Sequence, residues 1–442
     1  MKRVYQSSAD RITNLPADVI QRILVSLPIK DAAKTSILSS KWRHNWKSIP
    51  QLVFDGRFAR INRVSESQSD LRSKLVMLNI YKALLVHDGP ITKFVLSIPG
   101  LNFCDVIDHI VLYFSNKGVQ DFTLIERSTD DYQMHSSLFS ALHLKSLKLR
   151  SCELMPPYWF DGFSKLTHLR LGEVTLPSDF FENFLTKCPV LEYLRVVDCE
   201  GPAVELEIVA PCLKSFHYAG SLRVISFKCT PLLSCVALYT CDTETHVVAL
   251  FLYETDTHDM AALFASIPTI QKFCANGGFL KTAGHRNVPS RLPSPLHQLQ
   301  FLETIELDFD SLEWEHGFVC LIMGSPNLRR LKIEYHSMLE DQPTKNEVSN
   351  IRRLLEAEGC SGSSNCLQHL KEFIIWDSYG TQVELDIVRF VLATAPLLRL
   401  VHIKAAHNLS SKTVMKFSME ALRYKRVSKE AEFIYPWVDK DV

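Results

Sequence analysis

Basic and hydrogen-bonding side chains recur at matched positions in four successive segments near the middle of the sequence. They are Lys148, His168, Arg170, Tyr193, Arg195 and His217. Side chains of these types recognise carboxylates and phosphates, because their N–H and O–H groups donate hydrogen bonds and the cations add charge. Brought together, they could bind a phosphorylated or acidic segment of a protein, or a small anionic ligand. The alternative is an ordinary solvated surface, because long cationic side chains can splay apart in water.

The elements that would position these side chains are the strands of a repeat. Each copy has an apolar residue, two variable ones, an apolar residue, one variable one and an apolar residue, which is the strand half of a leucine-rich repeat. Clear copies begin at Leu144, Leu166, Leu191, Leu213, Leu302 and Leu328, and weaker copies at Ile91, Val119, Leu232, Ile270, Leu370 and Leu398. The starts from Ile91 to Leu232 lie 19 to 28 residues apart, close to the length of this repeat class. The sequence therefore predicts an α/β fold, an irregular leucine-rich-repeat solenoid with a curved parallel sheet and helices on its convex side.

Within each predicted strand, side chains alternate between the core and the open face of the sheet. If Leu147 points inward, Lys148 points outward, and the matched basic residues stack beside it in strands roughly 4.8 Å apart. His168 and Tyr193 fall in the neighbouring column. Further along the chain the outward residue is Glu306. We therefore expect a concave face that is basic in one part and acidic in another.

The segments between the strands predict helices and loops. Residues 178–189 predict a convex-side helix, because Phe180, Phe181, Phe184 and Leu185 form an apolar stripe. Residues 277–298 are rich in Gly, Pro and Ser and predict a loop, and a polar helix is expected near 347–358. Cys152 and Cys199 take the repeat position whose small side chain turns inward, so we expect buried thiols there.

The first fifty residues have a different pattern, in which Leu-Pro occurs twice and two tryptophans follow. Leu15-Pro16 predicts the start of a helix and Leu27-Pro28 its end, because proline suits only the first helical position. A second helix is expected from Lys30 to about Leu38, and a third from Ser39 to Trp46, with Trp42 and Trp46 stacked. So small a bundle seldom covers all of its apolar side chains, so we expect this segment to bind another protein.

These residues resemble an F-box, the motif by which substrate receptors of SCF-type ubiquitin ligases bind a Skp-family adaptor. The sequence matches the pattern LP…IL..LP…S.WR..W, with Arg43 directly after the first tryptophan. The resemblance implies adaptor contacts by Leu15, Pro16, Ile20, Ile23, Leu24, Leu27, Pro28, Ile37, Leu38, Ser39, Trp42 and Trp46. Some of these side chains must instead hold the three helices together, and the sequence does not divide the two groups.

Residues 366–404 follow the order strand, turn, helix, strand, and they resemble the FBD module found after leucine-rich repeats in many plant F-box proteins. The matches include Gly380-Thr381, Glu384 and Ala395-Pro396. The resemblance to plant F-box/FBD/LRR-repeat proteins covers nearly the whole chain. It implies five parts, which are an F-box over 8–55, a helical linker over 56–90, a leucine-rich-repeat solenoid over 91–340, an inserted loop over 341–365 and an FBD-like module over 366–442.

This resemblance implies a non-catalytic substrate-recognition subunit of an SCF-type E3 ubiquitin ligase. Its F-box would bind the Skp adaptor and, through it, a cullin–RING core, while its concave face would hold a protein target for ubiquitination. Two alternatives stay open. One is a leucine-rich-repeat scaffold outside any ligase, and the other is a receptor whose small-molecule ligand completes the target surface beneath the loops at 277–298 and 341–366.

Composition excludes several other classes of protein. Lys+Arg and Asp+Glu each number 49, so the formal net charge is zero and no overall field draws nucleic acid or an anionic membrane. No signal peptide or spanning segment is evident, so an intracellular location, the nucleus and/or the cytoplasm, is expected. The 12 cysteines include no Cys-x-x-Cys pair and the histidines lack ligand spacing, so we expect reduced thiols, no metal and no cofactor. Hydrolase and phosphate-loop motifs are absent, so no enzymatic activity is expected.

Overall fold

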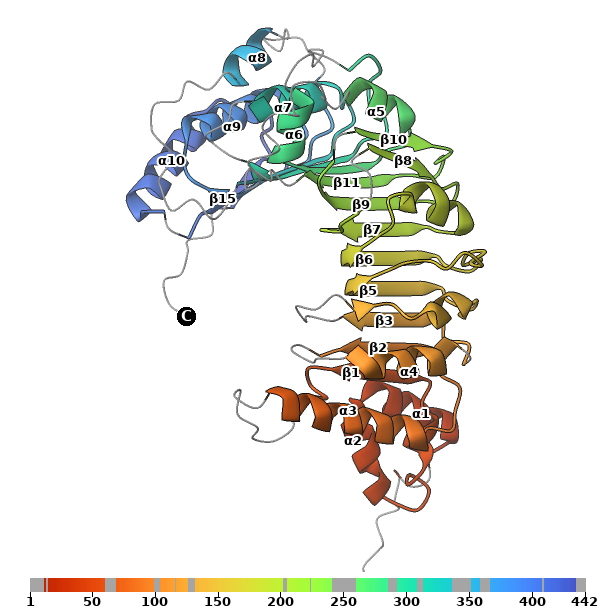
Figure 1. Ribbon diagram of the computed structural model, residues 1–442. Coiled ribbons are helices and arrows are strands. Elements are labelled where there is room, and N and C mark those ends of the chain that lie inside the picture. The colour runs from red at the N-terminus through yellow and green to blue at the C-terminus, as the bar shows by residue number, and fades with distance from the viewer. Residues whose placement is uncertain are drawn as a thin grey trace, which may run out of the picture. The chain divides into compact units, whose positions relative to one another are not determined.

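The computed structural model divides the chain into two compact units (Figure 1). The first comprises residues 1–191 and 198–202, and the second comprises 192–197 and 203–442. The structure describes residues 12, 15–59, 69–98, 104–115, 117–125, 132–201, 205–222, 224–240, 260–284, 292–307, 313–335, 351–357, 366–407 and 409–434.

The first unit begins with short helices and continues as a parallel sheet. Its helices are α1 (Ala17–Ser26), α2 (Ile29–Lys34), α3 (Ser69–Val86) and α4 (Cys104–Ser115), with 3-10 helices at Thr35–Ile37, Asn45–Ser48, Ser136–Ser140 and Leu185–Lys187 and a π-helical turn at Phe180–Phe184. Its strands are β1 (Gln51–Asp55), β2 (Lys93–Ser97), β3 (Asp121–Ile125), β4 (Tyr132–Gln133), β5 (Ser146–Glu153) and β6 (His168–Thr175). Strands β1, β2, β3, β5 and β6 pair in this order, all in parallel, and β4 extends the pairing along β5.

The second unit continues the same strand pattern with longer intervening helices. Its strands are β7 (Tyr193–Val197), β8 (Glu205–Val209), β9 (Ser215–Gly220), β10 (Val224–Lys228), β11 (Cys235–Thr240), β12 (Lys272–Asn276), β13 (Phe301–Leu307), β14 (Arg330–Tyr335), β15 (Glu372–Ser378), β16 (Leu400–Ala405) and β17 (Glu432–Ile434). Its helices are α5 (Met260–Ser266), α6 (Gly277–Gly284), α7 (Glu313–Met323), α8 (Ile351–Ala357), α9 (Gln382–Thr394) and α10 (Ser411–Arg423). The parallel order is β7-β9-β11-β12-β13-β14-β15-β16-β17, and β8 and β10 form a separate pair.

Leucine ladders between adjacent strands form the core of both units. Leu147 and Leu169 are register partners in the first unit, and Leu331 pairs with Phe373 in the second; all four side chains are buried. In the second unit the sheet curves and α6, α7, α9 and α10 cover its outer side (Figure 1). The predicted α/β fold with a long parallel sheet is therefore confirmed.

One backbone conformation recurs near the end of the strands. The seventh residue after the first apolar residue of a repeat is left-handed at Ser151, Glu173, Asp198, Glu306 and Asp377, with φ between 50° and 54°. This extra residue interrupts the alternation, so that the next side chain returns to the core instead of facing solvent. Burial of Cys152, Val174 and Leu307 follows from this geometry, whereas Cys199 is only half-buried.

The structure differs from the sequence-based expectations in the third helix of the N-terminal segment. The α-helix expected over Ser39–Trp46 is absent, because this described stretch forms turns followed by the 3-10 helix Asn45–Ser48. The helix expected from Lys30 to Leu38 is α2 and a 3-10 turn. Trp42 and Trp46 therefore do not share one α-helix.

The prediction of a loop over 277–298 is wrong in its first part, which forms α6. Asn276 caps this helix: its side-chain Oδ1 accepts hydrogen bonds from the backbone N–H of Phe279 (3.1 Å) and Thr240 (3.0 Å). A Cβ atom on Gly277 would lie 2.6 Å from the carbonyl oxygen of Glu306, so glycine here allows close packing and does not mark a loop. Residues 285–291 lie outside the described residues.

Two predicted repeat copies have the wrong register, and one sheet was missed. The inward residues of β13 are Leu302 and Thr304, preceded by Leu299, so the copy does not begin at Leu302. The copy assigned to Leu232 begins one residue later, at the buried Leu233. The small β8–β10 sheet was not predicted. The helix expected over 178–189 is a π-helical turn and a 3-10 turn, although its apolar stripe is buried as expected.

The FBD-like residues build the start of α9. The Thr381 side chain accepts a hydrogen bond from the backbone N–H of Glu384, and Glu384 in turn accepts from the backbone N–H of Thr381 at 2.8 Å, which is a capping box. The carboxylate also accepts from Tyr379 N–H (3.0 Å) and the Ser378 hydroxyl (3.2 Å). Gly380 precedes this cap with a φ of 72°, which glycine adopts without strain.

A substitution at Asp198 tests the left-handed position. Asp198→Val should lower the free energy of unfolding by about 1–2 kcal/mol, because a β-branched residue resists positive φ. Urea denaturation of the full chain would measure this. Asp198→Asn is the matched control, since asparagine tolerates the conformation and also removes the charge; equal losses in the two variants would contradict the prediction.

A second prediction concerns the pH dependence of stability at Glu384. Complete burial raises the pKa of this carboxyl to about 7, despite the opposing hydrogen bonds from Thr381 and Tyr379. The folded state therefore holds a proton that the unfolded chain has released between about pH 4.5 and 7, so stability should fall by on the order of 2 kcal/mol across this range.

Chemical denaturation at pH 5 and pH 7.5 would test the Glu384 prediction. Glu384→Gln should flatten the pH dependence, while the exposed Glu430→Gln should leave it unchanged. A pH dependence that survived in Glu384→Gln would contradict the assignment.

Candidate functional site

The N-terminal segment has a small closed core. Ile20, Leu24 and Trp42 are 0%, 0% and 2% exposed. The indole Nε1 of Trp42 donates a hydrogen bond to the Ile12 carbonyl (3.2 Å), and Lys41 Nζ donates to the Leu15 carbonyl (2.6 Å). These bonds fasten the start of the chain onto the turn that follows α2. Three of the twelve predicted contact residues therefore hold the segment together.

A second group of the predicted residues is exposed. Ile37, Leu38 and Ile23 are 87%, 52% and 37% exposed, and Pro16 and Pro28 are exposed as well. The remaining members, Leu15, Leu27, Ser39 and Trp46, are half-buried. Apolar side chains exposed to this extent on a small helical module are suited to burial against another protein. The sequence did not single out Ile12, which is 53% exposed and whose carbonyl accepts the hydrogen bond from Trp42.

The predicted basic column divides between the two units. In the first unit Lys148 and Arg170 are register partners on β5 and β6, and His168 lies opposite Ser146. Lys148 is half-buried and Arg170 is exposed. At the end of the same strands Arg150 forms an ion pair with Glu173. The first unit thus carries both charge signs along these two strands.

In the second unit Arg195 and His217 are register partners on β7 and β9, and Tyr193 lies opposite Ser215. Burial, followed by the positive charge of Arg195, lowers the pKa of His217 to about 4. His217 is therefore neutral near pH 7 and packs edge-on against Tyr239, with ring centroids 5.0 Å apart. The expectation that His217 adds to the basic character of this column is wrong, because the site is desolvated.

The sequence did not single out a polar row on the open face of the second unit. Lys332 Nζ contacts Glu303 (2.8 Å) and Glu334 (2.7 Å) and lies 3.8 Å from the centroid of the Trp376 ring. Although burial opposes its charge, hydrogen bonds to these two carboxylates raise the pKa of Lys332. Cys274 adjoins Glu303, with an Sγ–Oε2 distance of 3.7 Å. The outward position of the repeat beginning at Leu328 could have identified Lys332.

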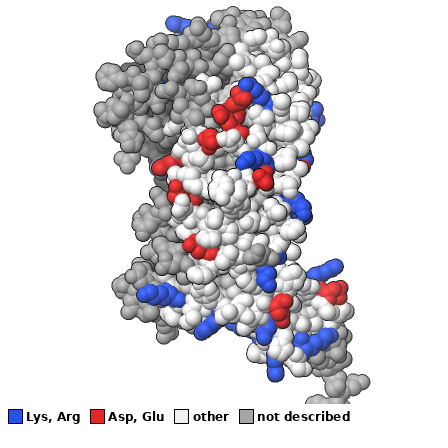
Figure 2. All heavy atoms as spheres, turned by 45° about the vertical axis from the view of Figure 1, so that its right-hand side comes forward, with Lys and Arg blue, Asp and Glu red and all other residues white. Residues whose placement is uncertain are grey.

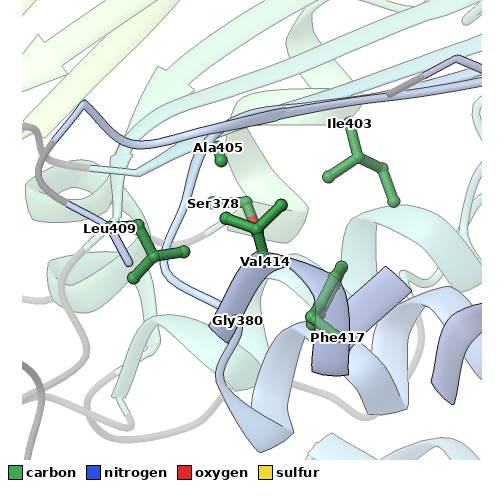
Figure 3. Close-up of a pocket in the computed structure, with 7 residues that line it drawn as sticks. All are labelled: Ser378, Gly380, Ile403, Ala405, Leu409, Val414 and Phe417. Carbon is green, nitrogen blue, oxygen red and sulfur yellow. The ribbon is translucent and has the colours of Figure 1, made fainter. Parts of the chain in front are cut away.

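Two cavities differ in what they could hold. One of about 350 Å³ lies between α3 and α4 and is lined by Tyr81, Leu84, Leu85, His87, His109, Ile110 and Tyr113. The other, of about 10 Å³, lies beneath α10 and is lined mainly by apolar side chains (Figure 3). A volume of this size holds one water molecule at most. Neither of these cavities is lined by residues 277–298 or 341–366.

Among the described residues there is no further candidate site formed by metal-binding side chains, and the face shown in Figure 2 is not of one charge sign. No cluster of three or more His, Cys, Asp or Glu side chains suited to a metal ion occurs among them. On the face shown in Figure 2, Lys and Arg are interspersed with Asp and Glu among uncharged residues. Among the helices that the structure describes, none is both long and apolar enough to span a bilayer.

Comparison with known proteins agrees with this arrangement. The F-box domain model matches residues 12–53, and a family model described as "FBD-associated F-box protein At5g56370, LRR repeats" matches residues 107–249. F-box/FBD/LRR-repeat protein At1g13570 of Arabidopsis thaliana is 30% identical over 429 residues, covering 97% of this chain and 99% of the relative. The chain belongs to the F-box/FBD/LRR-repeat family.

Other members of the F-box/FBD/LRR-repeat family extend the comparison. FBD-associated F-box protein At5g56370 of Arabidopsis thaliana is 25% identical over 447 residues, which cover 96% of this chain and all of the relative (100%). F-box/LRR-repeat protein At3g58940 of the same plant is 31% identical over 227 residues, covering 48% of this chain and 36% of the relative. The predicted resemblance is therefore confirmed, and the N-terminal module with its closed core and exposed apolar residues is an F-box.

Stability measurements should separate the two groups of F-box residues. Trp42→Ala should lower the free energy of unfolding of the F-box by about 3–5 kcal/mol, because it empties a buried site. Ile37→Ala should change it by no more than about 0.5 kcal/mol, because the side chain is already in water. Hydrogen exchange of the F-box amides would report both effects, and similar protection in the two variants would refute the division.

Proposed function

We propose that this protein is the substrate-recognition subunit of an SCF-type E3 ubiquitin ligase. In this role the F-box binds a Skp-family adaptor, which joins the protein to a cullin–RING core, and the leucine-rich repeats bind a protein target. The observation that carries the proposal is the exposure of Ile23, Ile37 and Leu38 on an F-box whose core is already closed. Burying these side chains against an adaptor would contribute roughly 1.5–3 kcal/mol for each fully covered residue.

The proposed mechanism is proximity and requires no chemistry from this chain. Holding a target lysine near a ubiquitin-loaded enzyme makes a bimolecular transfer effectively intramolecular. We place target-binding residues on the open face of each unit taken by itself: Lys148, His168 and Arg170 in the first unit, and Tyr193, Arg195 and His217 in the second. His217 would act there as a neutral ring. The proposed location is the nucleus and/or the cytoplasm.

The proposed division of the chain follows these roles. Residues 8–55 serve as the adaptor-binding F-box, 56–90 as the linker, 91–340 as the repeat region, 341–365 as an insertion and 366–442 as the FBD-like module. The linker range contains α3, whose following residue His87 donates from Nε2 to the Ile49 carbonyl at 2.9 Å. This contact ties the linker to the end of the F-box.

A pull-down with purified Skp-type adaptor and cullin tests the proposal. The full chain should retain both proteins, and Ile37→Asp/Leu38→Asp should weaken adaptor binding at least about 30-fold, because charges replace apolar contact side chains. Leu142→Asp, at a 58% exposed residue outside the F-box, is the matched control and should bind normally.

The alternatives give different results in the same experiment. Adaptor binding without cullin recruitment would favour a scaffold outside a ligase. Failure of the unmodified chain to bind adaptor would overturn the proposal.

A further inference from the structure

Helix α10 in the second unit has one side fixed against the protein. Phe417 and Ala421 are 4% and 0% exposed. Val414 and Phe417 point toward the small cavity, which is bounded by Ile403 and Ala405 of β16 (Figure 3). The Ser410 hydroxyl caps the helix by accepting from the Thr413 N–H at 3.2 Å. The rotation of α10 about its axis is therefore set by this packing.

The opposite side of α10 carries an exposed apolar row. Met415, Met419 and Leu422 are 56%, 51% and 46% exposed. Their spacing of four and three residues places them above one another on one face of the helix. Phe417 and Ala421 are the buried residues of this helix, whereas about half of each side chain in the row is exposed to solvent.

A cationic row runs beside the apolar one. Lys412, Lys416 and Arg423 are exposed, and their spacing places them next to the methionines on the solvent side. Residues 411–429 contain six Lys and Arg side chains and a single acidic residue, Glu420, although the whole chain has 49 of each sign. Among the residues that the structure describes, the ion pairs include none of these three cations.

We infer that α10 is a docking surface for an acidic amphipathic helix of a partner protein. The apolar row would pack against the apolar side of that helix, and the cationic row would face its Asp and Glu side chains. Methionine suits such a contact, because its unbranched, polarisable side chain adapts to the partner. Charge complementarity would fix the register and steer association.

The geometry favours a protein helix over a membrane surface. A helix that lies in a membrane interface presents a broad apolar face, commonly with aromatic residues. The free side of α10 offers only a row of three apolar residues with cations directly beside it, and its one aromatic residue, Phe417, is buried. This docking surface lies far along the chain from the F-box and does not depend on the proposed ligase role.

Fluorescence anisotropy with the full chain tests the inference. The probe is a labelled helical peptide with leucine at every third or fourth position and glutamate along the adjoining row. It should bind, and Met415→Ser/Met419→Ser/Leu422→Ser should weaken binding at least about tenfold. Lys412→Glu/Lys416→Glu/Arg423→Glu should weaken it as much, and raised salt should weaken binding to the unmodified chain.

Controls make the result decisive. Val224→Ser and Leu232→Ser alter exposed apolar residues elsewhere in the second unit and should bind the probe normally. A peptide with lysine in place of glutamate should not bind. Circular dichroism should show intact folding of the α10 variants, because every substituted side chain is exposed. Equal affinity for the two peptides, no binding, or binding to phosphatidylserine vesicles in place of the acidic peptide would overturn the inference.

Discussion

The repeating constraint on this protein is the return of a side chain to the core immediately after a left-handed residue. The register of a parallel pair continues through this bend where both strands have it, as in β5 and β6, and shifts where only one strand has it, as between β13 and β14 and between β15 and β16. Ser151 and Glu173 lie at the same repeat position in adjacent strands and share this conformation. The Ser151 hydroxyl also donates to the Glu173 carboxylate at 2.8 Å. This backbone conformation recurs at the ends of the strands, whereas the segments between strands differ in structure, from a π-helical turn to the 13-residue helix α9.

The F-box shows how a small module separates folding from recognition. Three large side chains close its core, and hydrogen bonds from Trp42 and Lys41 hold the incoming chain at Ile12 and Leu15. The motif residues outside this core are exposed or half-buried, so their burial is still available to a partner. Strand β1 begins within the residues that match the F-box and pairs with β2, so the module continues into the parallel sheet of its unit.

The sequence predicts those features that depend on whether each side chain along a strand is apolar or polar. Strand positions such as Leu147 and Leu331 followed from periodicity, because a buried face repeats every two residues. The register of the repeat copy in β13 was mispredicted because Thr304 occupies an inward position. It is fully buried, although threonine is a polar residue that a sequence pattern does not assign to the core. The helix after Asn276 was not predicted, because its first two glycines allow close packing against the backbone of Glu306 and Thr240. Glu306 and Thr240 are distant in sequence, so no local pattern indicates this packing.

The candidate sites were predictable in residue type but not in environment. The sequence motif identified the F-box residues but did not show which of them are buried. Leu24 is buried and Ile37 is exposed, and the exposure of Ile37 depends on the 3-10 turn that follows α2. His217 was counted as basic, although its desolvation and the charge of Arg195 leave it neutral near pH 7. Charge on a surface is likewise decided by neighbours and not by composition.

Electrostatic pairing distinguishes two surfaces of the second unit. Lys332 lies between Glu303 and Glu334 beside Trp376, so the cation in this row of the open face is paired within the protein. On α10 the cations lie beside exposed methionines, and the single acidic residue of the segment leaves most of that charge unbalanced. Balanced charges cost desolvation free energy when a partner covers them, whereas unbalanced charges gain from a partner of opposite sign. The proposed target-binding face of the second unit would therefore rely mainly on shape, and the proposed docking surface on α10 would rely on charge together with its apolar row.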